Sequence, residues 1–200
     1  MKSLLALVLV AALPWAANAD NSRLALGLAA TLDHEFMNQS GKSEYRSTAD
    51  TVGVMFGFPL GDAWRSAVTL SVIEQSVNDR SALVQPSATE YRQAGMVVGL
   101  GFSYPLASTG PFAVRVGITS TLGFLGRPSN GSGAYSNVFG TISLPVTASA
   151  AINQNWVVQV SLPVVTAAAK RVTASGKTTG MSSVRMNNGY SPTVAVLYNF

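Results

Sequence analysis

The end of the chain shows the clearest pattern of apolar and polar positions. Counting back from Phe200, the alternate residues Tyr198, Val196 and Val194 are aromatic or apolar, and their neighbours Asn199, Ala195 and Thr193 are small or polar. Successive side chains of a β-strand point to opposite faces, so this period of two places the bulky side chains on one face. The pattern predicts a strand that ends on an aromatic residue.

The same alternation recurs along the chain and predicts seven earlier strands. In each of them large apolar residues occupy one face, and glycine, alanine, serine and threonine dominate the other. Each segment has the roughly 9–11 residues that a tilted strand needs to cross a membrane. The predicted strands cover about 22–32, 48–58, 64–74, 92–104, 112–124, 136–148 and 156–166, and the last strand begins near Gly189.

The connections between these strands alternate in length. Short turns are predicted at 59–63, 105–111 and 151–155, and long polar loops at about 33–47, 75–91, 125–135 and 167–188. Short periplasmic turns and longer outer loops are typical of outer-membrane barrels with an even number of strands. Eight strands cannot enclose the bulky face, so we expect that face to contact lipid. The sequence therefore predicts an all-β fold, an eight-stranded antiparallel up-and-down transmembrane β-barrel.

Aromatic residues gather near the two ends of the predicted strands. Two such girdles are expected where a barrel crosses the two membrane interfaces. The periplasmic girdle contains Phe58, Trp64, Tyr104, Phe112, Trp156, Tyr198 and Phe200, and the outer girdle contains Phe36, Tyr45, Tyr91, Phe124, Tyr135 and Tyr190.

The first residues have the features of a secretory signal peptide. Lys2 supplies a positive charge, residues 4–13 are apolar, and Ala17 and Ala19 form a small-x-small cleavage site. We therefore expect a signal peptide over 1–19 and a barrel domain over 20–200. The chain contains no cysteine, and no later segment reaches the about 20 apolar residues of a membrane helix.

By its strands, its girdles and its last residues, the chain resembles the small eight-stranded bacterial outer-membrane β-barrels, such as the OmpA-type membrane domain and the OmpX group. The segment with Val194, Val196, Tyr198 and Phe200 is similar to the C-terminal signal that the barrel-assembly machinery reads in those proteins. The resemblance covers residues 20–200. It implies a monomer in the cell outer membrane, in contact with outer-membrane lipids and lipopolysaccharide.

Three arginines fall on the small, inward face of the predicted barrel. Arg23, Arg65 and Arg115 lie near the periplasmic ends of their strands, with no inward carboxylate at the same depth. Buried charges are costly unless they are paired, so water, Asp62 of the adjacent turn or an anion should neutralise them. A hydrated arginine plug and an anion site at the periplasmic mouth both fit this pattern.

Charge is unevenly placed along the chain. All nine carboxylates lie at or before Glu90, whereas residues 91–200 hold seven Lys or Arg and no acid. The later outer loops would present basic side chains at the level of lipopolysaccharide phosphates, for which they are suitable partners. Simple solvation of these loops is the alternative. The residues concerned are Arg127, Lys170, Arg171, Lys177 and Arg185.

The single histidine, His34, is the feature that suggests catalysis. With Asp79 and Ser81 of the second loop it would supply a base, an orienting carboxylate and a nucleophile. The lipid A palmitoyltransferases, also eight-stranded, are similar in placing a His in the first loop and an Asp-Ser pair in the second. Here Arg80 separates the two residues, and no room remains before the first strand for that family's N-terminal helix. We therefore predict no enzyme activity.

Pro145 and Pro163 each lie in a Ser-Leu-Pro-Val string, on strands predicted to be neighbours. Proline cannot donate a hydrogen bond to a β-ladder. Two facing prolines would weaken strand pairing and could open a lateral gap in the wall, whereas a β-bulge is the more common explanation.

The sequence thus predicts an outer-membrane barrel with a structural or surface-interaction role through its outer loops. A narrow pore, or a conduit for a hydrophobic or anionic ligand, is the alternative, and a lipid A-modifying acyltransferase-like enzyme comes third. We predict no cofactor and no nucleic-acid partner. No His, Cys or carboxylate cluster has metal-ligand spacing, so we predict no metal site.

Overall fold

The computed structural model describes residues 23–39, 43–61, 63–79, 89–127, 135–174, 177–186 and 192–200. Within these ranges, side chains are described for 23–32, 49–61, 63–76, 92–127, 138–171 and 192–200. No helix in the described ranges has the length and hydropathy needed to cross a membrane. The predicted signal peptide over 1–19 lies outside the described residues.

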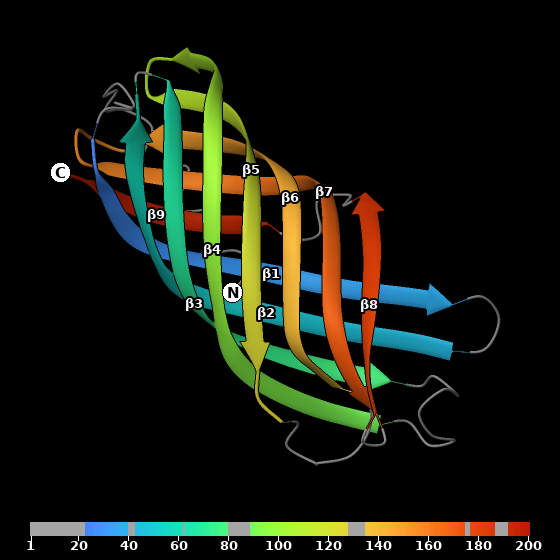
Figure 1. The fold of residues 1–200 in the computed structure, drawn as a ribbon. Coiled ribbons are helices and arrows are strands. Elements are labelled where there is room, and N and C mark those ends of the chain that lie inside the picture. Colours follow the sequence, from blue (N-terminus) through green and yellow to red (C-terminus); the bar gives the residue numbers. More distant parts are fainter. Residues whose placement is uncertain are drawn as a thin grey trace.

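The described ranges contain nine β-strands, all paired in antiparallel fashion, which form one sheet (Figure 1). The strands are β1 (Ala25–Gln39), β2 (Ser43–Leu60), β3 (Trp64–Asp79), β4 (Thr89–Thr109), β5 (Phe112–Leu125), β6 (Tyr135–Ala151), β7 (Trp156–Ala174), β8 (Lys177–Met186) and β9 (Thr193–Asn199).

The sheet closes into an eight-stranded barrel. Strands β1 to β7 pair in chain order, and β9 pairs with both β7 and β1, which completes the ring. Strands β8 and β9 share the eighth position, because β9 pairs with residues 156–161 of β7 and β8 pairs with residues 165–174. The predicted fold class is therefore confirmed.

The two ends of the barrel differ. The connections at 61–63, 110–111 and 152–155 are short and gather near the C-terminus (Figure 1). We call this the turn end. At the opposite end β1 and β2 pair as far as Gln39 and Ser43, and β7 continues into β8. We call this the hairpin end.

The bulky face of the sheet points outward. Leu28 and Val72 are 64% and 62% exposed, whereas the inward residues Ala29 and Ala195 are only 6% and 2% exposed. Alternate residues along β5 repeat the pattern, exposed and then buried or half-buried. This confirms the assignment of faces that the period of two predicted.

Several strands are longer than predicted. Much of the predicted loops at 33–47, 75–91 and 167–188 is strand, because ladder hydrogen bonds continue between polar strands that need no apolar face. The predicted turn at 105–111 is also wrong in extent. Strand β4 continues to Thr109 through a register shift between Pro105 and Ala107, and the turn is formed at Gly110, whose φ is 54°.

A β-bulge interrupts β7 at Val164. Leu144 pairs with Val165, but the next residue of β6, Pro145, pairs with Pro163, so β7 contains one extra residue. The two prolines do face each other, as the sequence analysis expected of neighbouring strands. An extra residue reverses the alternation of side chains beyond it, so even-numbered residues of β7 turn from the outer face to the inner face. Whether a lateral gap opens here stays a prediction.

Candidate functional site in the barrel lumen

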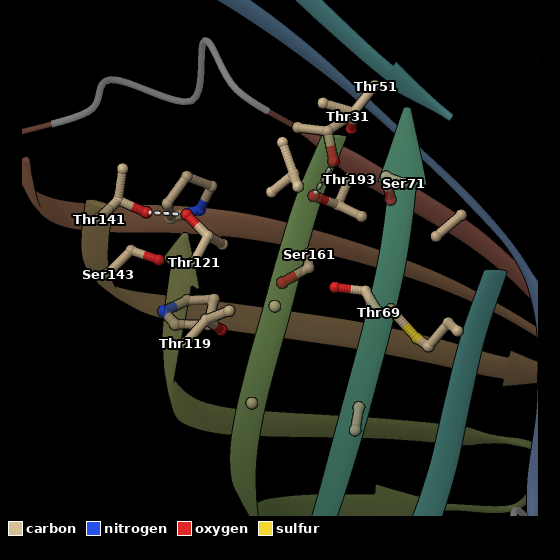
Figure 2. A pocket seen from close by; sticks show the side chains of 18 of the residues that line it. Thr31, Thr51, Thr69, Ser71, Thr119, Thr121, Thr141, Ser143, Ser161 and Thr193 are labelled. Atoms are coloured by element: carbon tan, nitrogen blue, oxygen red, sulfur yellow. Dashed lines mark hydrogen bonds between the residues drawn. The ribbon is translucent and has the colours of Figure 1, made fainter. Parts of the chain in front are cut away.

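The barrel encloses a central cavity of about 390 Å³, to which every strand from β1 to β7 and β9 contributes lining residues. Eight-stranded barrels usually have just enough interior for their own side chains. Here the inward residues are mostly alanine, glycine, serine and threonine, whose small side chains leave the centre empty. Figure 2 shows part of this lining.

The lining changes in character along the barrel axis, and β3 and β5 show the order. From the turn end, each of these strands places an arginine first, then two hydroxyl residues, then larger side chains. The residues are, on β3, Arg65, Thr69, Ser71, Ile73 and Gln75, and, on β5, Arg115, Thr119, Thr121 and Leu125.

A belt of hydroxyl side chains surrounds the middle of the cavity. Some of them pair across neighbouring strands. Thr31 and Thr193 share a hydrogen bond of 2.8 Å, and Thr121 and Thr141 share one of 2.6 Å between their Oγ1 atoms (Figure 2). Each hydroxyl both donates and accepts, so the belt suits water or polar solutes of either charge. The hydroxyl belt consists of Thr31, Thr51, Thr69, Ser71, Thr119, Thr121, Thr141, Ser143, Ser161 and Thr193.

Arg115 lies against the wall at the turn end. Its Nε donates to Ser103 Oγ at 3.0 Å, and its Nη2 donates to the carbonyl oxygens of Ala63 at 3.1 Å and Ser103 at 3.2 Å. Ser103 belongs to the neighbouring strand β4, and the whole residue Arg115 is only 6% exposed. The guanidinium is therefore fixed beside the lumen.

Arg65 reaches across the mouth of the barrel instead. Its Nη2 donates to the carbonyl oxygen of Arg23 at 3.3 Å and to Asn199 Oδ1 at 3.4 Å, so the side chain of a β3 residue meets the start of β1 and the end of β9. Gly57 lies beside it, and a Cβ there would be in van der Waals contact with Arg65 Nε at 3.4 Å. The side chain passes over the glycine.

The structure thus brings two of the three predicted arginines together at the lumen. Arg65 and Arg115 both line the cavity, and Ser103 Oγ donates to the carbonyl oxygen of Arg65 at 3.5 Å. Arg23 lies at the rim, where its Nη1 donates to the carbonyl oxygen of Gln154 at 3.4 Å. That these residues bind an anion stays a prediction.

An apolar cluster lines the lumen toward the hairpin end. Ile73, Val97 and Leu125 are buried together, and Phe139 packs against them. The ring of Phe139 fills the space beside its cross-strand partner Gly123, where an added Cβ would overlap it. The sequence signal for this cluster is an aromatic residue at an inward, mid-strand position of β6.

The basic residues predicted to face lipopolysaccharide separate in the structure. Arg127 and Arg171 are exposed, whereas Lys170 lines the cavity. Lys177 lies in β8 opposite Ala174, and Arg185 lies opposite Thr166, with side chains outside the described set. Lys170 lies in β7, where an outer loop was predicted, and it faces the lumen because the bulge at Val164 reverses the faces of the strand. Phosphate contact by these residues stays a prediction.

The predicted catalytic set is only partly described. His34 lies in β1 opposite Thr48, and Asp79 lies at the end of β3 opposite Tyr45. Their side chains are outside the described set, and Ser81 is outside the described residues. Elsewhere, the described part of the chain contains no group of His, Cys, Asp or Glu side chains that could hold a metal ion.

The last strand closes the barrel between β1 and β7. Val194 pairs with Ala30 and Val160, and Val196 is exposed on the outer face. The ring of Tyr198 lies 5.2 Å, centroid to centroid, from Trp156 and from Phe200. At the same end Trp64 and Tyr104 lie 5.2 Å apart, as a girdle requires. Recognition of this strand by assembly machinery stays a prediction.

Comparison with known proteins shows the fold class. No protein-family model matches the chain, and no curated protein matches it. Among solved structures, the outer membrane protein OprG from Pseudomonas aeruginosa is similar, with a TM-score of 0.61 and 13% identity over 93% of this chain and 97% of that one. The fold is therefore that of an eight-stranded outer-membrane β-barrel.

Two autotransporter structures are less similar. The β domain of the Bordetella autotransporter BrkA gives a TM-score of 0.39 at 12% identity, over 90% of this chain and 99% of that one. The transport unit of the autotransporter AIDA-I from Escherichia coli gives 0.32 at 8% identity, over 88% of this chain and 89% of that one. These TM-scores are too low to add to the fold assignment.

Proposed function

We propose that this protein is an outer-membrane barrel that admits small polar solutes to its lumen and acts as a narrow pore. The observation that carries the proposal is the cavity of about 390 Å³, lined by all eight positions of the ring. A purely structural barrel of this size is expected to be filled by its own side chains. Its turn end would face the periplasm, because short turns lie on that side in outer-membrane barrels.

The chemistry of the lining supports polar solutes. Cavities of about 300–1,000 Å³ are the usual size of small-molecule sites, so the lumen suits solutes of a few heavy atoms with their water. The hydroxyl belt offers donors and acceptors that replace part of a solute's hydration shell. The two arginines at the turn end narrow the path on the periplasmic side.

The test is solute flux through reconstituted protein. In liposome swelling, the wild type should admit small polar solutes, and Gly101→Phe should abolish the flux. Gly101 lines the cavity, and a Cβ there would come no closer than 3.6 Å to another atom, so a large side chain can enter the lumen without displacing backbone.

Gly140→Phe is the matched control. Gly140 lies between the outward residues Val138 and Ile142 of β6, does not line the cavity, and also leaves 3.6 Å to the nearest atom for a Cβ. Flux that survives in Gly140→Phe and is lost in Gly101→Phe supports passage through the lumen. Equal flux in both variants, or none in the wild type, would refute the pore.

A surface-interaction role is the second candidate, and the length of the hairpins favours it. The last β1–β9 pair is at Thr31, whereas β1 and β2 remain paired to Gln39 and Ser43. The β1–β2 hairpin therefore projects beyond the barrel wall on the side we assign to the cell exterior. If the lumen proves closed to solutes, this role becomes the better explanation.

The finer assignments belong to the same proposal. We propose a monomer made with a cleaved signal peptide, inserted by the barrel-assembly machinery, and related to the OmpA-type or OmpX barrels. Lipopolysaccharide would contact exposed Arg127 and Arg171. We propose no catalytic role. Lipid A mass spectrometry that changes between wild type and His34→Ala would overturn that part.

A further inference from the structure

The inference concerns the sign of the charges in the lumen, and it rests on the proposed pore function. Three charged residues lie among the described residues that line the cavity, namely Arg65, Arg115 and Lys170, and all three are cationic. The described lining contains no Asp or Glu. The carboxylates Asp50 and Glu74 are described too, but they lie on the outer face, where Glu74 meets Arg92 at 3.5 Å.

The three cations lie at opposite ends of the path. Arg115 pairs with Thr147 on the turn-end side of the hydroxyl belt. Lys170 pairs with Phe139, which belongs to the apolar cluster on the hairpin-end side. A solute that crosses the lumen therefore passes cationic side chains at both ends. We call these the two cationic stations, Arg65 with Arg115 at the turn end and Lys170 at the hairpin end.

The β-bulge at Val164 is what places the second station. Without the extra residue, the alternation of β7 would carry Lys170 to the outer face together with Leu162 and Val164, which are 41% and 46% exposed. With it, Lys170 lines the cavity while its neighbour Arg171 is exposed. The register shift beside the Pro145–Pro163 pair thus has a direct consequence for lumen charge.

We propose that the lumen conducts small anions in preference to cations, and that Lys170 is the specificity-determining cation at the hairpin end. Rings of Lys and Arg make pores anion-selective because they raise the local concentration of anions and exclude cations from a narrow path. Between the stations, the hydroxyls of the belt donate hydrogen bonds to an anion. The substrate class is therefore small inorganic anions and short monocarboxylates.

The test is the ratio of chloride to potassium permeability in planar bilayers under a KCl gradient. The wild type should favour chloride. Lys170→Gln should lower the ratio by about sevenfold, since a unit charge several ångströms away in a water-filled lumen attracts chloride and repels potassium by roughly RT each, about 2RT in the ratio. Lys170→Arg should keep the wild-type ratio because it retains the charge.

Arg171→Gln is the matched control. It removes the same charge from the adjacent residue of the same strand, but from the exposed face. Bilayers of phospholipid alone contain no lipopolysaccharide for Arg171 to contact, so the permeability ratio should not change. Equal effects of Lys170→Gln and Arg171→Gln, or a wild type that prefers potassium, would overturn the inference. An unchanged ratio in Lys170→Gln would overturn it as well.

The two proposals fail in different ways. A wild-type protein that neither conducts nor supports liposome swelling refutes the pore itself. A protein that conducts without preferring chloride refutes only the anion selectivity. For each variant, the gel mobility of an unheated sample is compared with that of a heated one to confirm that the barrel is folded. The permeability ratio is measured only for folded variants.

Discussion

Replacing Val54 by lysine tests whether the bulky face of the sheet contacts lipid. Val54 is 48% exposed, and its cross-strand partners Leu28 and Leu70 are 64% and 46% exposed. On the same face of β2, Asp50 lies four residues toward the hairpin end and Phe58 four residues toward the turn end. At about 3.3 Å per residue, the polar boundary and the aromatic girdle are each about 13 Å away along the strand, so Val54 lies near the middle of the apolar band.

A lysine on the lipid face of a barrel costs about 2–4 kcal/mol at the bilayer midplane and far less near the interfaces. We therefore expect Val54→Lys to lower the free energy of unfolding by about 2–4 kcal/mol. The measurement is urea unfolding of the protein folded into phospholipid vesicles, followed by tryptophan fluorescence. The matched variant is Thr69→Lys, which introduces the same charge into the lumen, on the strand that pairs with β2. It should cost under about 1 kcal/mol, because lumen substitutions are not exposed to hydrocarbon.

A result in which Thr69→Lys is as destabilising as Val54→Lys, or more so, would refute the reasoning. It would mean that the bulky face is not in contact with hydrocarbon. Val54→Leu serves as the check on packing, since it keeps an apolar side chain at the position. Its stability should stay close to that of the wild type.

Three further substitutions probe the lumen and the closing strand. Gly123→Val should destabilise the fold by roughly 1–3 kcal/mol, because its Cβ overlaps the Phe139 ring. Urea unfolding should show that adding Phe139→Ala restores stability. A double variant no more stable than Gly123→Val alone would exclude this contact as the cause. Thr121→Val removes the 2.6 Å hydrogen bond to Thr141 and should cost about 1 kcal/mol; a double-mutant cycle with Thr141→Val that gives no coupling would contradict it. Phe200→Ala should slow insertion into vesicles when folding is followed on gels, and an unchanged rate would contradict the role assigned to the terminal aromatic residue.

The sequence was sufficient to predict which residues face outward and which face the lumen, because lipid contact imposes a simple rule. Outward residues in the apolar band are mostly large and apolar, with Ser120 of β5 an exception, and inward residues are not under this constraint. Residues as close as Val54 and Met55 therefore differ sharply, the first exposed and the second buried. Because lipid contact constrains each outward residue separately, the face that a residue occupies can be predicted from the sequence alone.

The same rule explains where the sequence-based prediction was wrong. Beyond the apolar band strands lie in water, so the alternation fades although the ladder continues to Gln39 in β1 and Ala174 in β7. The bulge at Val164 is a property of two strands together, since it becomes visible only when Pro145 is paired with Pro163. The side of the wall that Lys170 occupies depends on that pairing, and a period counted along one strand cannot show it.

The interior was predictable in composition but not in arrangement. Small inward residues indicated that the lumen has few bulky side chains. Its volume and the order of its layers depend on strand register, which sets the depth of Thr121 against Thr141 and of Phe139 against Lys170. The register of each strand pair depends on all eight positions of the closed ring, because a register shift in one pair of strands changes the depth of the lining residues on the others.

The arginine plug and the anion site, two alternatives in the sequence, are compatible in the structure because the two arginines differ in how they are held. Arg115 is fixed to the wall by three hydrogen bonds of 3.0–3.2 Å. Arg65 spans the mouth through two bonds of 3.3 and 3.4 Å, which lie beyond the usual range for a strong N–H···O bond. In the proposed anion path, the Arg65 guanidinium would narrow the mouth and would exchange a carbonyl or amide partner for an anion, with which it forms stronger charge-assisted bonds. Under this proposal, the same side chain would supply both the constriction and the preference for anions.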